Sequence, residues 1–294
     1  MRPAQKVNML NHNSPLVSTD WLAAHLEDPS VRIVDVRWYL PNVDRLGSAE
    51  YAAGHIPGAV FVDLETELSA EAYIDGPGRH PLPTPEAFER VMRRIGVSSD
   101  TLVVAYDDQG GTAARLWWLL RYFGHERAAV LDGGIVAWTR ERRLLEIGAG
   151  MSVPTGDFQA RPNPSMAVDK AQVMGLSGDP KALLIDARPG ERYEGRQEPI
   201  DARPGHIPGA KNIPWAQNLD ADGRFLDSEA LRAMYAELGA DEADRVVCYC
   251  GSGVSACYDI LAMYMAGWRD VHLYVGSWSD WSSTPKLPVA TGRE

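Results

Sequence analysis

A cysteine opens a glycine-rich loop in the second half of this 294-residue chain, in the order Cys250-Gly251-Ser252-Gly253-Val254-Ser255. An apolar run, 245–249, precedes the loop and a longer one, 256–266, follows it, so the pattern predicts a strand, a tight loop and a helix. Glycines let successive backbone N–H groups turn toward one point, and the helix N-terminus adds the positive end of its dipole. Because such a loop favours a thiolate or a bound anion, we expect Cys250 to be a nucleophile that could also carry a persulfide.

The loop itself offers groups that can assist a thiolate. Ser252 and Ser255 carry hydroxyls that could hydrogen-bond the sulfur or pass a proton, and a role in stabilising the loop is an equal alternative. The backbone amides of Gly251, Gly253 and Val254 would stabilise developing negative charge.

Arg192 is the candidate for binding a substrate. It follows a predicted strand by a few residues, and its guanidinium could hold a carboxylate or a sulfonate through two parallel hydrogen bonds. The alternative is an exposed surface arginine, and Arg196 and Arg203 are weaker candidates nearby.

Other chemistries of cysteine are disfavoured. A cysteine phosphatase requires the pattern Cys-x5-Arg, but position 256 is Ala and the loop contains no arginine. No His–Asn or His–Asp pair indicates a cysteine hydrolase. No second Cys/His pair completes a zinc site with Cys248 and Cys250, so we expect no metal site. We expect Cys248 and Cys257 to be ordinary buried thiols of a strand and a helix.

The chain contains two copies of one pattern. The turn Gly54-His55-Ile56-Pro57-Gly58-Ala59 recurs unchanged as residues 205–210, and 31–37 matches 182–188, both at an offset of 151 positions. Farther along, 103–107 matches 246–250 and 133–138 matches 276–281, at an offset of 143. Copies of about 140 residues are too long for solenoid repeats and indicate duplicated domains.

Features that occur in both copies are expected to be structural. Asp35-Val36-Arg37 recurs as Asp186-Ala187-Arg188, so we expect each arginine to pair with a neighbouring carboxylate. His55 and His206 belong to the duplicated turn and are expected to be turn residues.

Features of one copy are candidates for chemistry. Cys250 corresponds to Asp107 in the first copy, and Arg192 corresponds to Pro41. The second copy is therefore predicted to be catalytic and the first to be an inactive partner.

Short apolar runs alternate with helical patterns in both copies. In the first copy the strands are expected at 32–36, 59–62, 101–106 and 129–131, and the helices at 21–26, 85–95, 112–123 and 134–140. In the second copy the strands are expected at 182–185, 210–213, 246–249 and 271–274, and the helices at 170–175, 228–238, 254–266 and 277–281. The alternation predicts an α/β fold of two tandem domains, each with a mostly parallel sheet flanked by helices. We expect an N-terminal domain over 1–143, a Gly- and Pro-rich extended linker over 144–167 and a catalytic domain over 168–294.

The composition disfavours some classes of binding partner. The net charge is −11 and no basic run is present, so nucleic acid and anionic membranes are not expected as partners. No segment approaches the roughly 18 continuous apolar residues of a membrane span. The polar residues 1–14 lack the apolar core of a signal peptide, so we expect a cytoplasmic protein.

From about Ser14 to Gly292 the chain resembles the two-domain rhodanese family of sulfurtransferases. The motifs that carry the resemblance are the two Gly-His-Ile-Pro-Gly-Ala turns, the Cys250 loop, and residues 78–83, 131–134 and 276–281. The resemblance implies tandem rhodanese-like domains, the first of them inactive. It also implies a persulfide on Cys250 that forms from a small anionic sulfur donor and passes to cyanide or to a thiol acceptor such as thioredoxin, without a cofactor.

The resemblance leaves open which of two sulfur donors, 3-mercaptopyruvate or thiosulfate, the protein uses. The neutral loop 250–255 is similar to that of 3-mercaptopyruvate sulfurtransferases, with Ser255 where Thr is commoner, whereas thiosulfate sulfurtransferases typically carry cationic residues after the cysteine. Arg192 matches the family's substrate-binding arginine. The mercaptopyruvate pattern has a second arginine after Glu-Pro, where this chain has Ile200-Asp201, as in the thiosulfate type.

That pattern also tends to have an aspartate near His55 that relays protons with a serine. Leu46 stands at about that place, and Asp44 is close. We favour 3-mercaptopyruvate as the donor, with a thiosulfate-preferring rhodanese second. A non-catalytic persulfide carrier or sensor is the alternative from another class.

Overall fold

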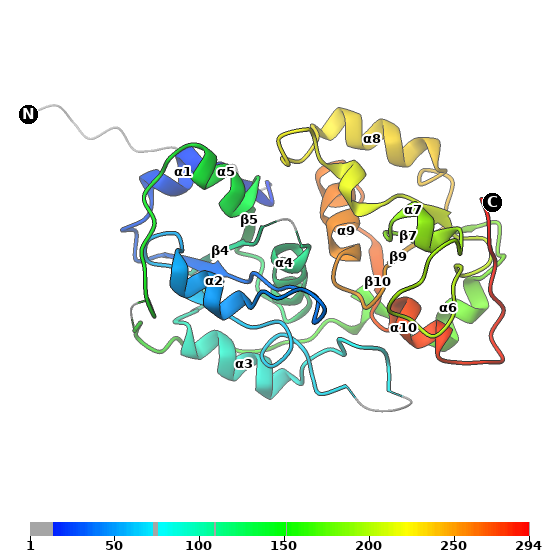
Figure 1. The fold of residues 1–294 in the computed structure, drawn as a ribbon, viewed down its shortest axis with the longest axis horizontal. Helices are drawn as coiled ribbons and strands as arrows, with labels where there is room; N and C mark the ends of the chain where they lie inside the picture. The colour runs from blue at the N-terminus through cyan, green and yellow to red at the C-terminus, as the bar shows by residue number, and fades with distance from the viewer. Residues whose placement is uncertain (1–13, 73–75, 109, 151, 294) are drawn as a thin grey trace, which may run out of the picture.

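The structure is a computed structural model that describes residues 14–72, 76–108, 110–150 and 152–293. Figure 1 shows two lobes side by side, one coloured from blue to green and the other from light green to red. Residues 1–13, which entered the prediction about a signal peptide, lie outside the described ranges. Within those ranges, no helix has the length and apolar character needed to cross a membrane.

The first lobe is built on a five-stranded sheet in the order β1-β5-β4-β2-β3, in which every strand pair is parallel. Its strands are β1 (Leu16–Val17), β2 (Val31–Asp35), β3 (Val60–Phe61), β4 (Leu102–Tyr106) and β5 (Ala128–Leu131). The flanking helices are α1 (Thr19–Ala24), α2 (Gly47–Ala53), α3 (Pro85–Arg94), α4 (Thr112–Tyr122) and α5 (Gly134–Arg140). The start of α3 follows from sequence, because Thr84 caps it by accepting the Ala87 N–H and Pro85 stands at its first position.

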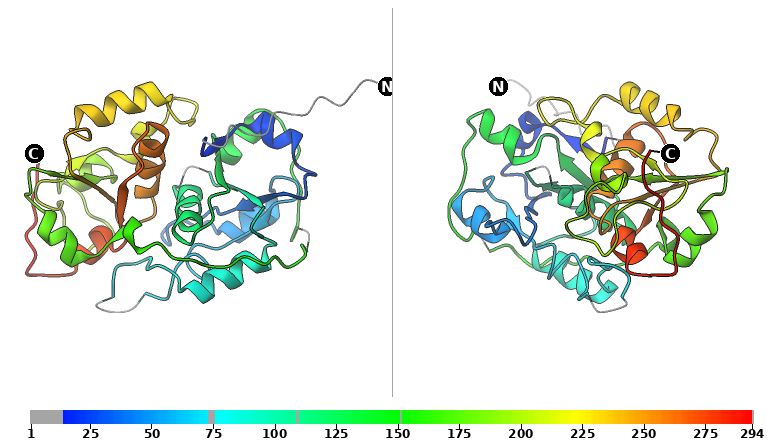
Figure 2. Two further views of the ribbon diagram at one scale, coloured as in Figure 1. Left: turned by 180° about the vertical axis from the view of Figure 1, so that it is seen from behind. Right: turned by 45° about the vertical axis from the view of Figure 1, so that its right-hand side comes forward.

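The second lobe repeats this topology with a parallel sheet in the order β6-β10-β9-β7-β8. Figure 2 shows the two lobes in two further views, with the second lobe coloured from light green to red. Its strands are β6 (Ala167–Val168), β7 (Ala182–Asp186), β8 (Lys211–Asn212), β9 (Arg245–Tyr249) and β10 (Val271–Tyr274). Its helices are α6 (Lys170–Leu176), α7 (Gly190–Tyr193), α8 (Ser228–Glu237), α9 (Ala256–Met265) and α10 (Ser277–Ser282), with short 3₁₀ turns η1 (Pro164–Met166) and η2 (Trp215–Asn218). The predicted α/β fold with two tandem sheets is confirmed.

The predicted strands and helices are present, with ends that differ by no more than two residues. The sequence analysis did not predict β1, β6, α2 and α7. The segment predicted as a linker, 144–167, packs along the first lobe, where the Arg93 Nε donates to the Phe158 carbonyl at 2.8 Å. Its last residue, Ala167, lies in β6 and pairs with Leu273 of β10.

The duplicated motifs have structural roles, as predicted. Arg37 pairs with Asp35 and Arg188 with Asp186, and all four side chains are buried. Each arginine also donates to the glycine carbonyl of the duplicated turn, to Gly54 at 2.8 Å or to Gly205 at 2.6 Å. These contacts tie the end of each second strand to the turn that follows it.

The two lobes meet along α4 and α9, which share one apolar core that includes Trp117 and Leu261. The two helices come close together at their starts. Gly111, at the N-cap of α4, has φ +89°, and a Cβ there would lie 2.8 Å from the Cα of Ser255. Glycine at this position therefore brings the degenerate loop of the first lobe against the Cys250 loop of the second.

Candidate active site

Cys250 follows directly after β9, at the carboxyl end of the central part of the second sheet. Its Sγ accepts a hydrogen bond from the Gly253 N–H at 3.2 Å, which is one of the loop amides predicted to stabilise negative charge. The loop is pinned from behind by α10, because Trp278 N–H donates to the Cys250 carbonyl and the Ser277 Oγ accepts the Cys250 N–H. The side chain of Cys250 is buried, but it reaches the wall of a cavity.

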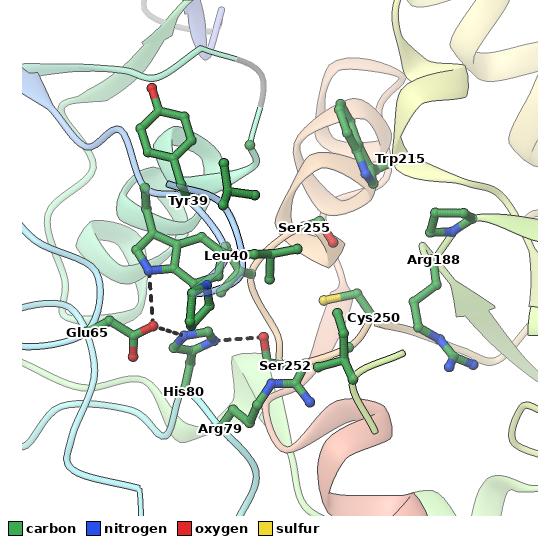
Figure 3. A pocket seen from close by; sticks show the side chains of 18 of the residues that line it. Tyr39, Leu40, Glu65, Arg79, His80, Arg188, Trp215, Cys250, Ser252 and Ser255 are labelled. Carbon is green, nitrogen blue, oxygen red and sulfur yellow. Dashed lines mark hydrogen bonds and ion pairs between the residues drawn. The ribbon is translucent and has the colours of Figure 1, made fainter. Parts of the chain in front are cut away.

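This cavity, of about 690 Å³, lies between the two lobes, and Figure 3 shows side chains from both lobes around it. The second lobe contributes the predicted residues Cys250, Gly251, Ser252, Val254, Ser255 and Arg192. The first lobe contributes the opposite wall, including Trp38, Tyr39, Leu40, Glu65, Arg79 and His80. The lobe predicted to be an inactive partner therefore supplies half of the site.

A chain of hydrogen bonds crosses from Ser252 into the first lobe (Figure 3). The Ser252 Oγ lies 2.7 Å from the His80 Nδ1, and the His80 Nε2 lies 3.1 Å from the Glu65 Oε1. Hydrogen bonding to His80 lowers the pKa of Glu65. In the tautomer with the proton on Nε2, His80 donates to the Glu65 carboxylate and its Nδ1 accepts the Ser252 hydroxyl. His80 is buried, whereas the Glu65 side chain is 47% exposed, so the chain connects the loop with solvent.

The sequence analysis missed His80 and Glu65. The mercaptopyruvate pattern has an aspartate near His55, but here Leu46 stands at the N-cap of α2 with an exposed side chain. The signal in the sequence that marks His80 is its segment, 78–83, one of the motifs that carry the family resemblance.

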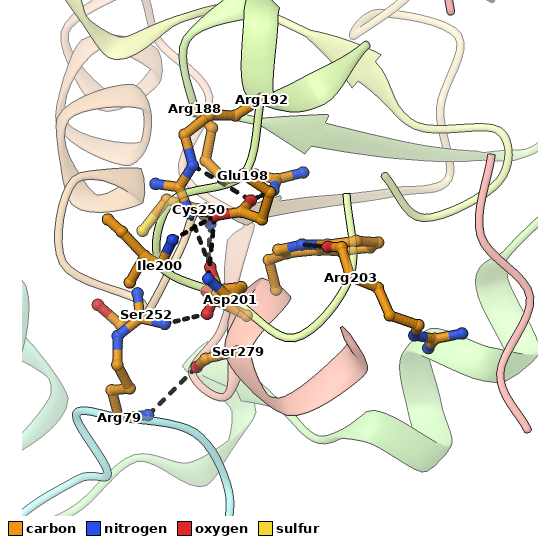
Figure 4. A network of polar contacts seen from close by, with 12 residues as sticks. Arg79, Arg188, Arg192, Glu198, Ile200, Asp201, Arg203, Cys250, Ser252 and Ser279 are labelled. Carbon is orange, nitrogen blue, oxygen red and sulfur yellow. Dashed lines mark hydrogen bonds and ion pairs between the residues drawn. The ribbon is translucent and has the colours of Figure 1, made fainter. Parts of the chain in front are cut away.

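Arg192 lies at the cavity with its side chain only 15% exposed, so it is not a free surface arginine. Its Nε and Nη2 contact carboxylates (Figure 4), with Nη2 2.7 Å from Glu198 and 2.7 Å from Asp201. Glu198 also pairs with Arg188 at 3.2 Å. Burial works against the charge on Glu198, but hydrogen bonds from Arg192 and from backbone amides lower its pKa.

Arg79 reaches the same place from the first lobe and pairs with the other oxygen of Asp201 (Figure 4). A Cβ on Gly251 would lie 2.9 Å from the Arg79 Nη2 and 3.6 Å from the Arg192 Nη1. The two guanidinium groups therefore lie directly over the backbone next to Cys250.

Arg115 on α4 supports the site from behind. It is completely buried and donates to the Gly253 carbonyl at 3.1 Å and to the His80 carbonyl at 3.2 Å. One guanidinium thus joins the Cys250 loop to the segment that carries His80. Burial lowers the pKa of Arg115, and charge on Cys257 or Cys250 acts in the opposite direction.

The remaining candidates are placed as follows. Ser255 is the N-cap of α9 and makes no side-chain capping bond, so its hydroxyl faces the cavity unengaged by the helix. Arg203 donates to four carbonyls around the end of α10, and Arg196 pairs with Glu194 at the surface, which removes both as candidates for binding a substrate.

Cys248 and Cys257 are buried free thiols, as expected. Burial raises the pKa of Cys257 to about 12 and raises that of Cys248 well above its ordinary value, so neither competes with Cys250 as a nucleophile. Among the described residues, no group of three or more His, Cys, Asp or Glu could hold a metal ion.

Comparison with known proteins gives one family and several relatives of similar length. The model of the rhodanese-like domain matches residues 18–141 and again 169–284. A Pseudomonas aeruginosa protein named "Probable 3-mercaptopyruvate sulfurtransferase" is 42% identical over 95% of this chain and 99% of its own length. A Mycobacterium tuberculosis protein named "Putative thiosulfate sulfurtransferase SseB" is 43% identical over 90% of this chain and 92% of its own.

Among solved structures, the chain is similar to the 3-mercaptopyruvate sulfurtransferase SseA from Escherichia coli, with a TM-score of 0.79 and 39% identity. The match covers 90% of this chain and 99% of that one. Relatives named for different sulfur donors are thus equally similar to this sequence, and overall identity does not distinguish the donors.

Proposed function

Because the chain belongs to the rhodanese-like domain family and is a sulfurtransferase, we propose that it takes sulfur from 3-mercaptopyruvate onto Cys250 and passes it to a thiol or to cyanide. Cys250 is the nucleophile, Ser252 passes a proton, and Ser255 hydrogen-bonds the sulfur. The amides of Gly251, Gly253 and Val254 stabilise the charge.

In the first half-reaction the Cys250 thiolate attacks the mercapto sulfur of the donor. The S–S bond forms as the C–S bond breaks, and the electron pair of the C–S bond remains on the departing carbon as the enolate of pyruvate. The mercapto group loses its proton and the enolate carbon gains one, so the products are pyruvate and the Cys250 persulfide anion.

The single observation that carries the choice of donor is the Ser252–His80–Glu65 chain beside Cys250. The mercaptopyruvate reaction needs a group that accepts the mercapto proton and returns a proton to carbon, and this chain can do both. Thiosulfate needs no proton transfer, because sulfite leaves with the electron pair of the broken S–S bond. A proton relay through the buried His80 therefore helps the reaction of 3-mercaptopyruvate, whose sulfur is bound to carbon, and not the reaction of thiosulfate.

The charge of the site supports the same donor. Arg192 is already balanced by Glu198 and Asp201, so the site does not offer the surplus positive charge that would compensate a dianion such as thiosulfate. 3-Mercaptopyruvate brings one carboxylate and a neutral thiol.

In the second half-reaction an acceptor attacks the outer sulfur of the persulfide. A thiolate acceptor leaves as its own persulfide, and cyanide leaves as thiocyanate, while Cys250 regains its electron pair as the thiolate. A protein thiol such as that of thioredoxin is a proposed acceptor, and a cytoplasmic location stays a prediction.

The test compares the two donors on the same enzyme. Persulfide formation is followed by intact mass, as the gain of one sulfur atom on Cys250, and turnover is followed as pyruvate or sulfite released with cyanide as acceptor. We expect 3-mercaptopyruvate to load and turn over faster than thiosulfate, and Cys250→Ser to do neither. Equal or faster loading by thiosulfate would overturn the donor assignment. A stoichiometric burst without turnover would indicate a persulfide carrier instead of an enzyme.

A further inference from the structure

Two arginines from different lobes converge above the Cys250 loop, and one internal carboxylate occupies the space between them. Asp201 contacts Arg79 with Oδ1 and Arg192 with Oδ2, and the second distance is 2.7 Å. The geometry is that of a carboxylate held between two guanidinium groups, which is how arginines bind carboxylate ligands. The Asp201 side chain is 2% exposed, so it is shielded from water in this position.

We propose that Arg79 and Arg192 form a carboxylate-binding site shared by the two lobes, and that Asp201 occupies it until the carboxylate of a ligand takes its place. The proposal rests on the proposed function in one respect, since it takes the donor's carboxylate as the natural ligand. The chemical class it recognises is a small monocarboxylate whose reactive atom lies beside Cys250.

The position of the arginines supports a ligand site. Both guanidinium groups lie within 4 Å of the point where a Gly251 side chain would begin, next to the reactive sulfur. Both arginines line the cavity, and so does Ile200, which directly precedes Asp201. A ligand bound to the pair would therefore be inside the cavity and close to Cys250.

Binding of a ligand carboxylate would require Asp201 to move away from the arginines or to take up a proton. Among the described residues, Arg79, Arg188 and Arg192 are matched by three carboxylates, those of Asp186, Glu198 and Asp201. A ligand carboxylate would add an uncompensated negative charge at a buried site unless one of these acids left or took up a proton. Burial raises the pKa of Asp201, although Arg79 and Arg192 act against this, whereas hydrogen bonds lower the pKa of Glu198, so Asp201 gives up its charge more easily than Glu198 does.

The backbone also favours Asp201 over Glu198 as the group that moves. Glu198 is held by two arginines, Arg188 and Arg192, and accepts the N–H groups of Ile200 and Asp201. Asp201 lies in a segment between α7 and β8 without helix or strand, beside the exposed Ile200. The chain has Ile200-Asp201 where the mercaptopyruvate pattern has a second arginine, and Arg79 of the other lobe supplies a second guanidinium here.

The experiment measures how fast Cys250 reacts with two alkylating probes: iodoacetate, which carries one carboxylate, and iodoacetamide, its neutral analogue. Peptide mapping distinguishes Cys250 from the buried Cys248 and Cys257. In Asp201→Asn the ratio of the iodoacetate rate to the iodoacetamide rate should rise about tenfold over that of the wild type, equivalent to roughly 1.4 kcal/mol. In the double variant Arg79→Gln/Asp201→Asn this rise should disappear.

Asp241→Asn is the matched control, because Asp241 also pairs with an arginine of the second lobe, Arg232 at 2.5 Å, near the end of α8. A ratio in Asp201→Asn no higher than in this control, or a rise that survives the loss of Arg79, would overturn the proposal. Asp201→Ser repeats the test if the amide variant folds poorly. Alkylation needs no sulfur transfer, so this result is independent of which donor the enzyme prefers.

Discussion

Arg115 is a cation that the protein buries completely without a carboxylate partner among the described residues. Burying an unpaired charge costs free energy of folding, so we expect Arg115 to serve the function of the site. Arg115 holds the Gly253 carbonyl on one side of the Cys250 loop. In the proposed reaction, negative charge develops on the Cys250 sulfur on the other side of that loop. The residue also fixes the backbone of His80, and we regard it as a positioning residue for both.

Arg115→Met should therefore lower the turnover number with 3-mercaptopyruvate by about tenfold or more, since preorganised charge and geometry are lost together. The melting temperature should not fall, because an apolar side chain of similar length replaces a buried ion. Arg115→Lys keeps the charge but cannot serve both carbonyls, so its turnover should be intermediate. Unchanged turnover in Arg115→Met, measured beside its thermal unfolding, would contradict this role.

At the scale of residues, the sequence predicts the nucleophile and its loop but not the partners of that loop. Cys250 and Ser252 are recognisable because glycines surround them and because the first copy lacks them. Glu65 carries no such mark, and it becomes significant only because folding brings it to His80. Arg192 is predicted correctly as a residue of the cavity, but its neutralisation by Glu198 and Asp201 depends on contacts that spacing does not encode.

The turn between β9 and α9 depends on Gly253. Its φ is +78°, and a Cβ there would lie 2.5 Å from the Val275 carbonyl oxygen, against which the loop is packed. Gly253→Ala should move the loop and with it the amide that bonds Cys250, so turnover should fall by about a hundredfold, the effect typical of losing one preorganised donor.

Gly267, which follows α9, is the matched control for this variant. Its φ is also positive, at +104°, but nothing lies within 4 Å of the added Cβ. Gly267→Ala should lower the stability by about 1 kcal/mol through backbone strain and leave the turnover unchanged. Equal losses of turnover in the two alanine variants would mean that the contact with Val275 has no special role.

Helix α9 also carries a buried acid whose titration should be visible in stability. Asp259 accepts from the Asn218 Nδ2 at 2.7 Å, and its Oδ2 has no partner among the described residues. Burial raises the pKa of Asp259 well above its ordinary value, although the bond from Asn218 acts against this. As pH rises above the ordinary pKa of aspartate, the unfolded chain loses this proton before the folded one, so the acid makes folding less favourable with rising pH.

Asp259→Asn should remove this dependence and exceed the wild type in melting temperature by about 3 °C or more at neutral pH. The difference between the two proteins should grow as pH rises from acid to alkaline, which is measured by thermal unfolding in a series of buffers. Parallel curves would show that Asp259 does not titrate above its ordinary range in the folded protein.

At the scale of elements, the sequence predicts most of the sheet and helices because each copy confirms the pattern of the other. Three of the differences concern β1, β6 and the start of α9. Strands β1 and β6 have two residues each, and both are defined by pairing with β5 or β10 instead of by their own pattern. Helix α9 begins at Ala256, two residues later than predicted, because Val254 and Ser255 still belong to the turn.

The two lobes exchange equivalent segments across their interface. Before α3, residues 78–80 of the first lobe dock on the second, where the Arg79 N–H donates to Ser279 of α10. Before α8, residues 223–225 of the second lobe dock on the first, where the Phe225 N–H donates to Asp132 just before α5. The two segments have the sequences Gly-Arg-His and Gly-Arg-Phe.

Because each lobe contributes a segment to the other, comparison of the two copies placed the catalytic residues in the second lobe alone. Matching by offset compares each position with its equivalent, but it contains no information about which copy touches which. The segment that completes the Cys250 site comes from the first lobe. The equivalent segment of the second lobe contacts Asp132 of the first lobe, whose own loop has Asp107 where the second has Cys250. There the Asp107 carboxylate accepts the Ala113 N–H at 2.9 Å and so supplies its own negative charge to the start of α4.

Because segment 78–80 contacts the Cys250 loop and segment 223–225 contacts Asp132, substitutions of His80 and of its equivalent, Phe225, should affect turnover unequally. His80→Phe gives both halves of the molecule the same residue and breaks the chain between Ser252 and Glu65. Turnover with 3-mercaptopyruvate should fall by about a hundredfold, the lower end for loss of a general acid–base group, whereas turnover with thiosulfate should fall far less because no proton is transferred. Phe225→His makes the reciprocal change beside Asp132 of the first lobe, whose own loop holds Asp107 in place of a thiol, and should leave both rates unchanged. Steady-state rates with both donors check this, and equal losses with the two donors in His80→Phe would mean that His80 shapes the loop without moving a proton.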